Sequence, residues 1–222
     1  MQKKQIITLL CNSLLLICIT ACHHNTPKTG EMSAEDAIEL LDARIRKDSK
    51  NHTLLFERAQ LYMQTGRVNE AIADLTQAIK LKSNKIEYQL LLADAYFANG
   101  DVEHSYQTLD QALKTDPQNQ EAILKQGEIA FYSRDYDRAL TNLSTVTAKD
   151  PNNRTALFMK SFIYKEKGDT TNAILLLRKV CDIYPDYAPA FEELGILYAY
   201  HPDPLATEYL KTAIRLNPNN TN

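Results

Sequence analysis

Small, aromatic and leucine positions recur along this chain at a fixed interval of 34 residues. The first column of small residues reads Ala59, Ala93, Gly127, Ser161 and Gly195. A second small column, twelve residues further on, reads Ala71, Ser105, Ala139 and Ala173. Between them stands an aromatic column of Tyr62, Tyr96, Tyr164 and Tyr198, with Ala130 as the exception. Because a fixed period of this length is the sequence signature of a repeat architecture, we expect a tandem array of similar units.

Each unit has the pattern of two helices joined by a short turn. The units run over residues 52–85, 86–119, 120–153, 154–187 and 188–220. Glycines expected to take the left-handed conformation in these turns are Gly66, Gly100 and Gly168. In the third unit Arg134 replaces this glycine. We expect that turn to form with slight strain, because Asp135 still supplies a capping group.

Residues 33–51 form a half unit before the first full repeat. Ser33 is a predicted N-cap, and Asp36 follows three residues later as a weaker relative of the capping-box residue. The apolar residues on one face of this helix are Ile38, Leu41 and Ile45. Because the segment is in register with the second helix of every later unit, we expect an N-terminal helix that caps the array.

These columns resemble those of the tetratricopeptide repeat (TPR) family, over residues 52–220 and the half unit before them. The resemblance implies an all-α fold: a right-handed α-solenoid of five TPR helix pairs preceded by one N-terminal capping helix. The sequence departs from the family pattern at three positions where a large apolar residue is usual, Arg58, Gln126 and Lys160. We expect these three residues to loosen local packing without changing the fold.

Residues 1–21 have the layout of a secretory signal peptide. Lys3 and Lys4 give a basic start, and a largely apolar run follows from residue 6 to residue 19. The run is too short and too interrupted by polar residues for a comfortable membrane span. We therefore expect this segment to be removed from the mature protein.

The sequence ITAC at residues 19–22 resembles a bacterial lipobox, which implies that Cys22 is lipidated and becomes the first residue of the mature protein. Residues 22–32 then form a flexible tether, because they lack apolar periodicity. His23, rather than aspartate, follows the cysteine, and in such lipoproteins this favours an outer-membrane location facing the periplasm. The alternative is an ordinary signal peptide cut near Ala21, with an incidental cysteine.

The rest of the sequence gives no indication of catalysis, of a cofactor or of a metal site. The net charge of −3 becomes −5 after removal of residues 1–21, and a mildly acidic chain without a basic stripe is poorly suited to binding nucleic acid. The HExxH, GxSxG, GxGxxG and Walker motifs do not occur. His52, His104 and His201 lie in different units without a shared metal-ligand spacing. Cys181 falls in an apolar column, so we expect an inert buried thiol.

In the TPR family the first helices of the units line a concave groove that holds an extended peptide or a partner's helix. The resemblance places three residues of each of the first four units on this groove: Phe56, Gln60, Met63, Leu90, Asp94, Phe97, Leu124, Glu128, Phe131, Phe158, Phe162 and Lys165. The alternative is that the large side chains pack between neighbouring helices. Groove exposure is favoured for Phe97, Phe131 and Phe162, and both interpretations stay open for the leucines.

Some family members bind a C-terminal carboxylate through a clamp of lysine and asparagine. The matching positions here are Phe56, Gln60, Leu91, Glu121 and Lys125. Only Lys125 suits a carboxylate. A segment with apolar anchors and some basic residues is therefore a better-matched ligand than an acidic tail.

The leading hypothesis is a lipid-anchored, non-enzymatic adaptor of the bacterial cell envelope that binds a partner protein in its groove, as assembly factors do. A second hypothesis is a permanent structural or regulatory subunit of a larger envelope complex, without a peptide ligand. An enzyme is the third and least supported hypothesis. The last predicted helix, residues 205–216, leaves Leu210 and Ile214 as an apolar edge for self-association or for a partner.

Overall fold

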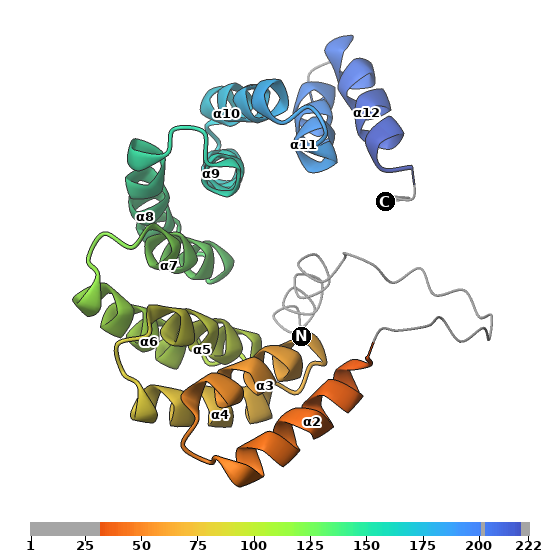
Figure 1. The fold of residues 1–222 in the computed structure, drawn as a ribbon. Coiled ribbons are helices and arrows are strands. Elements are labelled where there is room, and N and C mark those ends of the chain that lie inside the picture. Colours follow the sequence, from red (N-terminus) through yellow and green to blue (C-terminus); the bar gives the residue numbers. More distant parts are fainter. Residues whose placement is uncertain (1–31, 201–202, 219–222) are drawn as a thin grey trace, which may run out of the picture. The chain divides into compact units, whose positions relative to one another are not determined.

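The computed structural model describes residues 32–200 and 203–218, and in these ranges every regular element is an α-helix (Figure 1). The helices are α2 (Ala34–Lys47), α3 (His52–Gln64), α4 (Val68–Leu81), α5 (Ile86–Ala98), α6 (Val102–Thr115), α7 (Gln120–Tyr132), α8 (Tyr136–Lys149), α9 (Arg154–Glu166), α10 (Thr170–Ile183), α11 (Ala188–Ala199) and α12 (Leu205–Leu216). The predictions for the signal peptide, Cys22, His201 and most of the tether lie outside the described residues.

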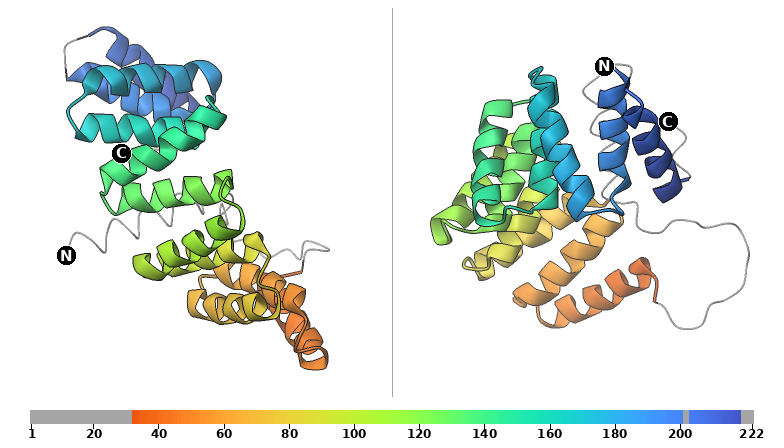
Figure 2. Two further views of the ribbon diagram at one scale, coloured as in Figure 1. Left: turned by 90° about the vertical axis from the view of Figure 1, so that its left-hand side faces the viewer. Right: turned by 90° about the horizontal axis from the view of Figure 1, so that it is seen from above.

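The helices follow the 34-residue period of the sequence. The first helices of the five pairs begin at His52, Ile86, Gln120, Arg154 and Ala188. The second helices of the first four pairs begin at Val68, Val102, Tyr136 and Thr170, and α2 begins 34 residues before the first of these. The two helices of each pair lie side by side (Figures 1 and 2). The predicted array of five helix pairs preceded by one helix is therefore confirmed.

The chain divides into two compact units. Unit 1 ends at Thr115 and contains α2 to α6, whereas unit 2 begins at Asp116 and contains α7 to α12. Within unit 2, the first helices α7, α9 and α11 lie on one side and the second helices on the other (Figure 1). None of the helices in residues 32–200 and 203–218 has the length and apolar character needed to cross a bilayer.

The leucine column is the centre of each of the first four helix pairs. Leu75, Leu109, Leu143 and Leu177 are 0 to 2% exposed. Small residues on the facing helix leave room for these leucines. A Cβ atom on Gly195 would lie 2.7 Å from Leu210 Cγ, so a larger residue at this position would force the two helices of the last pair apart. The repeat of small and large residues is thus a packing pattern, in which burial of each leucine contributes about 1.5–3 kcal/mol.

The turn between helices has the same backbone form in four units. Gly66, Gly100 and Gly168 have φ values of 74°, 81° and 79°. Arg134 takes the same left-handed conformation, with φ of 62°, although it carries a side chain. Asp135 caps α8, because its carboxylate accepts a hydrogen bond from the backbone N–H of Arg138 at 3.2 Å. Both parts of the prediction for this turn are confirmed.

The N-terminal helix begins as the sequence predicts. Ser33 Oγ accepts a hydrogen bond from the backbone N–H of Asp36 at 3.1 Å, and it donates to the carboxylate of Asp36 at 2.7 Å. Ile38 and Leu41 are buried, and Ile38 belongs to one core cluster with residues of the first full pair. The helix therefore covers the apolar surface that α3 and α4 would otherwise expose.

The expectation that Arg58 loosens packing is wrong. Its Nε and Nη2 atoms each donate to the carboxylate of Asp74 at 2.7 Å, and its Nη1 donates to Asp42 at 2.6 Å. The three residues come from α3, α4 and α2, so one guanidinium connects three helices. The planar guanidinium has several N–H donors and can bond to two carboxylates at once. These bonds compensate for the water that Arg58 loses through its partial burial.

Lys160 also has partners at its position. Its Nζ atom lies 3.1 Å from Ser144 Oγ and 3.3 Å from Thr147 Oγ1, both on α8. Burial lowers the pKa of this lysine, and the nearby charge of Lys179 lowers it further. The hydroxyl groups replace part of the water that the ammonium group loses, so α8 and α9 remain packed here.

Candidate protein-binding surfaces

The first helices of unit 2 present a cluster of aromatic rings. Phe158 lies 5.0 Å from Phe162 and 5.2 Å from Tyr187, and Phe131 lies 6.3 Å from Phe162, measured between ring centroids. All three contacts are edge-to-face, which is a favourable arrangement for aromatic rings. We call Phe131, Phe158, Phe162 and Tyr187 the aromatic face. Each of its side chains is only half-buried, although the rings contact one another.

A partly buried ion pair borders the aromatic face. Lys165 Nζ lies 2.6 Å from the carboxylate of Glu193 on α11, with 27% and 19% of the two side chains exposed. The same ammonium group lies 4.5 Å from the centre of the Phe162 ring. Because Glu193 and the ring face already stabilise this cation, Lys165 does not offer a free positive charge to a ligand.

The other end of the aromatic face carries a second cation. The guanidinium of Arg154 lies 4.7 Å from the ring centre of Tyr187 and 5.5 Å from that of Tyr184. Burial raises the pKa of the Tyr187 phenol, so this ring stays neutral well into the alkaline range. Burial raises the pKa of the nearby Tyr132 to about 12, with a contribution from Glu128. The surface therefore combines neutral rings with charges that mostly have internal partners.

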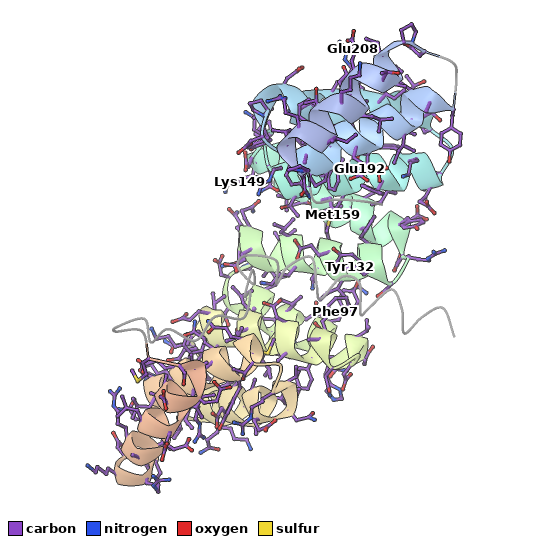
Figure 3. The ribbon with its side chains drawn as sticks, turned by 90° about the vertical axis from the view of Figure 1, so that its right-hand side faces the viewer. Phe97, Tyr132, Lys149, Met159, Glu192 and Glu208 are labelled. Carbon is purple, nitrogen blue, oxygen red and sulfur yellow. The ribbon has the colours of Figure 1, made fainter. Side chains whose placement is uncertain are left out.

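The remaining predicted residues of unit 2 lie on the same two helices. Leu124 and Glu128 on α7 are half-buried. Helices α7 and α9 contact each other directly, which brings the α7 residues beside those of α9. Figure 3 marks one residue on each of α7, α9 and α11: Tyr132, Met159 and Glu192. Unit 2 thus brings its six predicted groove residues together on adjacent first helices.

Unit 1 presents a less aromatic surface on α3 and α5. Phe56 packs against Tyr88 with 4.5 Å between ring centroids, whereas Phe97 is half-buried near the end of α5 (Figure 3). Gln60 is exposed, and Met63 and Asp94 are half-buried. Leu90 is only 7% exposed, which favours the packing interpretation at that position. The predicted surface of unit 1 therefore has fewer partly exposed aromatic residues than that of unit 2.

Groups that could carry other chemistry are engaged or dispersed. His52 lies 2.8 Å from the Tyr88 hydroxyl, and His104 lies 2.7 Å from the carboxylate of Asp101. Burial raises the pKa of the Cys181 thiol to about 12, so it is protonated at neutral pH. In the part of the chain that the structure describes, no three His, Cys, Asp or Glu side chains gather as a metal site would require.

Sequence reasoning did not identify three residues of the unit 2 surface: Arg154, Tyr187 and Glu193. Arg154 and Tyr187 stand at the first and last positions of the fourth unit. The column of Arg154 has no repeated residue type, and Tyr187 stands where Asn51, Asn119 and Asn153 cap earlier helices. Glu193 belongs to the fifth unit, outside the four units in which the family resemblance places groove residues. Apolar residues mark a column clearly, whereas a cation and its partners on other helices can be matched only in three dimensions.

The folded chain is a helix-pair repeat protein, and sequence comparison assigns its family. Models described as "TPR repeat" and "Tetratricopeptide repeat" match residues 59–100, 86–129 and 124–188. These matches overlap and continue from residue 59 to residue 188. The chain belongs to the tetratricopeptide repeat family.

Solved structures of the same architecture agree with this assignment. MamA from Desulfovibrio magneticus RS-1 has a TM-score of 0.67 and 21% identity, with 77% of this chain and 97% of that chain covered. YrrB, a TPR protein with an unusual peptide-binding site, has a TM-score of 0.60 and 20% identity, with 82% and 95% covered. A TPR protein from Parabacteroides merdae has a TM-score of 0.67 and 19% identity, with 82% and 70% covered. Comparison with curated proteins finds no match. At these identities the similarity concerns the fold.

Proposed function

We propose that this chain is a lipid-anchored adaptor of the bacterial cell envelope, which holds a partner protein on the first helices of its repeats. The TPR architecture supports a role in protein–protein interaction. The aromatic face of unit 2 carries the proposal most directly. Partly exposed aromatic rings on adjacent helices provide apolar contact area at a low cost in side-chain entropy.

The partner binds mainly through apolar side chains. Lys165 has Glu193 as its partner, and Lys125 lies 4.0 Å from Glu121. Neither cation is therefore well placed to form a new ion pair with a carboxylate terminus. A peptide or helix with two or three apolar anchors matches the aromatic face better than an acidic tail does. Peptide binding is recorded for YrrB in the description of its structure, and we extend it to this chain as part of the proposal.

The anchor is part of the same proposal. Cys22 lies within a lipobox-like sequence and before a short tether. A lipidated Cys22 would hold the repeats close to the periplasmic side of the outer membrane, because several acyl chains on one residue anchor firmly. The alternative function is a permanent subunit of an envelope complex. A single partner that stays bound through purification at high salt would favour this alternative.

Site-specific crosslinking tests the binding surface. A photoreactive amino acid replaces Phe162 in one variant and Leu175 in the other, and each variant is expressed in full length in a bacterium. Leu175 is the matched control, because it is 61% exposed but lies on the second helix α10. We expect a discrete crosslinked partner, identified by mass spectrometry, only from position 162. Equal products from both positions, or none from position 162, would contradict binding at the aromatic face.

The anchor is tested separately by Cys22→Ala. We expect loss of metabolic labelling by radioactive palmitate and loss of the protein from the detergent phase in a detergent-partition assay. Cys181→Ala is the matched control, because this buried cysteine lies outside the lipobox-like sequence. Continued membrane retention of the Cys22→Ala variant would contradict lipidation.

A further inference from the structure

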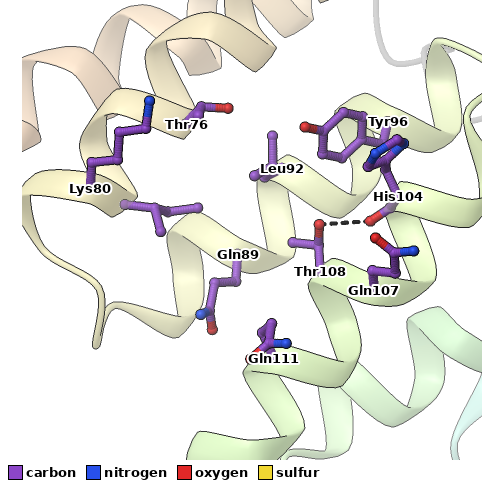
Figure 4. Close-up of a pocket in the computed structure, with 10 residues that line it drawn as sticks. Thr76, Lys80, Gln89, Leu92, Tyr96, His104, Gln107, Thr108 and Gln111 are labelled. Carbon is purple, nitrogen blue, oxygen red and sulfur yellow. Dashed lines mark hydrogen bonds between the residues drawn. The ribbon is translucent and has the colours of Figure 1, made fainter.

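A cavity of about 340 Å³ opens among α4, α5 and α6 in unit 1 (Figure 4). Its lining residues include Ile79 and Leu92 as apolar groups, together with the stacked rings of Tyr96 and His104. The polar lining consists mainly of amides and hydroxyls: Thr76, Gln89, Gln107, Thr108 and Gln111. None of the twelve predicted groove residues lines this cavity. The cavity is open to solvent rather than enclosed, so it can admit a side chain or short segment of another polypeptide.

Gln89 is an anomaly in the repeat. The equivalent residues 34 positions before and 34 and 68 positions after it are Leu55, Ile123 and Leu157. All three of these are buried apolar residues, and Gln89 is buried as well, with 8% of its surface exposed. Its Oε1 atom is buried without a hydrogen-bond partner. An unpaired buried acceptor destabilises the folded state, so an amide in this column requires a reason other than packing.

Other side chains of the cavity also leave acceptors available. Thr108 donates its hydroxyl to the backbone oxygen of His104 at 2.7 Å, as Figure 4 shows. The amide nitrogen of Gln107 donates to Glu103 at 2.8 Å. Each of these side chains therefore retains oxygen lone pairs, as Gln89 does. The cavity thus favours a ligand that donates hydrogen bonds.

Charge restricts the ligand further. The lining includes no carboxylate, and its only lysine or arginine is Lys80. A cationic ligand would meet Lys80 without a compensating acid among the lining residues. An uncharged N–H group matches the unpaired acceptor of Gln89. The apolar lining from Ile79 and Leu92 suits a short aliphatic stem attached to that group.

We propose that the cavity among α4, α5 and α6 binds an uncharged amide of a partner polypeptide, whose N–H group donates a hydrogen bond to Gln89 Oε1. A glutamine or asparagine side chain supplies a primary amide, and an extended backbone supplies a secondary amide. Because Oε1 is covered in the structure, the Gln89 amide rotates about its terminal torsion to meet the donor, and this torsion is soft. Unit 1 would then hold a partner through a surface distinct from the first-helix groove.

Four small probes of equal chain length test the proposal on the full chain. They are butyramide, N-methylbutyramide, butyrate and n-butylamine, and each is titrated while amide resonances near Gln89, His104 and Thr108 are followed by NMR. We expect saturable shifts with an amide, at a dissociation constant on the order of 10 mM for so small a ligand. Tighter binding of butyramide would assign the site to a side-chain amide, and tighter binding of N-methylbutyramide to a peptide backbone. Binding of either charged probe as tight as that of the amides would overturn the proposal.

Gln89→Leu provides the second measurement. Leucine occupies the equivalent position at Leu55 and Leu157, so this variant is expected to fold and to unfold at a higher temperature than the natural chain. We expect the dissociation constant for the amide probes, measured by the same NMR titration, to rise at least tenfold in this variant. Gln77→Leu is the matched control, because Gln77 is exposed on α4 and does not line the cavity. Retained amide binding in Gln89→Leu, or equal loss in Gln77→Leu, would contradict the proposed contact.

Discussion

The two compact units hold different residues in one column of the repeat, the column in which a large apolar residue is usual. In unit 1 the column holds Arg58, which forms ion pairs with Asp42 and Asp74, and Leu92, which is buried. In unit 2 it holds Gln126, Lys160 and Leu194. Polar residues at these positions are compatible with the fold as long as neighbouring helices supply partners. The comparison shows that a repeat column specifies a place in the packing, and that its chemistry depends on the neighbours.

A second difference concerns titratable groups. In unit 1, burial raises the pKa of Tyr62. In unit 2, burial raises the pKa values of four groups: Tyr132, Tyr187, Tyr209 and Cys181. Unit 1 is therefore expected to depend most on its ion network, and unit 2 on aromatic and apolar packing. The following predictions separate these two sources of stability.

The largest effect is expected for Asp74→Asn. Asp74 has 9% of its side chain exposed and accepts two hydrogen bonds from Arg58. In the variant, the partly buried guanidinium of Arg58 would keep only one carboxylate partner, Asp42. Removing one partner of such a pair lowers the free energy of unfolding by about 3 kcal/mol. Chemical denaturation followed by circular dichroism measures the loss, and hydrogen exchange should locate it in α2 to α4.

Asp42→Asn is the control for this prediction. Asp42 contacts the same guanidinium at 2.6 Å, but 35% of its side chain is exposed, so water can replace it. We expect a loss of about 1 kcal/mol. Equal losses in the two variants would mean that burial does not determine the strength of these contacts.

Alkaline pH should weaken unit 2 through Cys181. The pKa of its thiol is raised to about 12 in the folded chain, against about 8.5 in an unfolded chain. The unfolded chain therefore loses this proton first, and stability that is fully present below pH 8.5 is lost as pH rises toward 12. At pH 10 the loss is about 2 kcal/mol.

Cys181→Val tests this linkage, because valine is apolar and cannot ionise. We expect the slope of unfolding free energy between pH 8.5 and pH 10 to become smaller in the variant, when measured by denaturation at a series of pH values. Tyrosines with raised pKa values add to the slope only near pH 10 and above. An unchanged slope would show that the thiol is accessible to water when the chain is folded.

A smaller loss is expected for Gly195→Ala. The new Cβ atom would lie 2.7 Å from Leu210 Cγ and 3.2 Å from the backbone nitrogen of Leu210, so α11 and α12 must separate slightly. Overpacking of this kind costs about 1–3 kcal/mol, against a gain of about 1 kcal/mol from alanine in a helix. We expect a net loss of about 1 kcal/mol in thermal or chemical unfolding.

Gly127→Ala is the matched change in another pair of unit 2. There the new Cβ atom would lie 3.0 Å from Leu143 Cδ2, the end of a flexible side chain. The leucine can turn slightly, so the gain in helix propensity should offset the contact and the net effect should lie near zero. A larger loss in this variant than in Gly195→Ala would contradict the packing argument.

The sequence alone predicts much of this fold, because small and leucine columns repeat without interruption. Such columns report burial, and burial in a helix pair depends on residues close in sequence. The surroundings of individual polar residues could not be predicted in this way. Arg58 looks like a packing defect until Asp42 and Asp74, 16 residues away on either side, are seen to surround it. Gln89 stands in an apolar column, and this signal was present in the sequence, but only the structure shows a cavity beside it.

The last comparison concerns the left-handed turn position, which holds arginine in one repeat and glycine in another. Arg134 in unit 2 and Gly100 in unit 1 are equivalent, with φ values of 62° and 81°. A side chain in this conformation costs about 1 kcal/mol, so Arg134→Gly should raise the free energy of unfolding by up to that amount. Gly100→Arg should lower it by a similar amount, although no atom lies within 4 Å of the position of a new Cβ at Gly100. Changes in denaturation midpoint of similar size and opposite sign in the two variants would show that backbone conformation alone determines the preference for glycine at this position. A stabilising effect of arginine in both units would instead assign the role to its side chain.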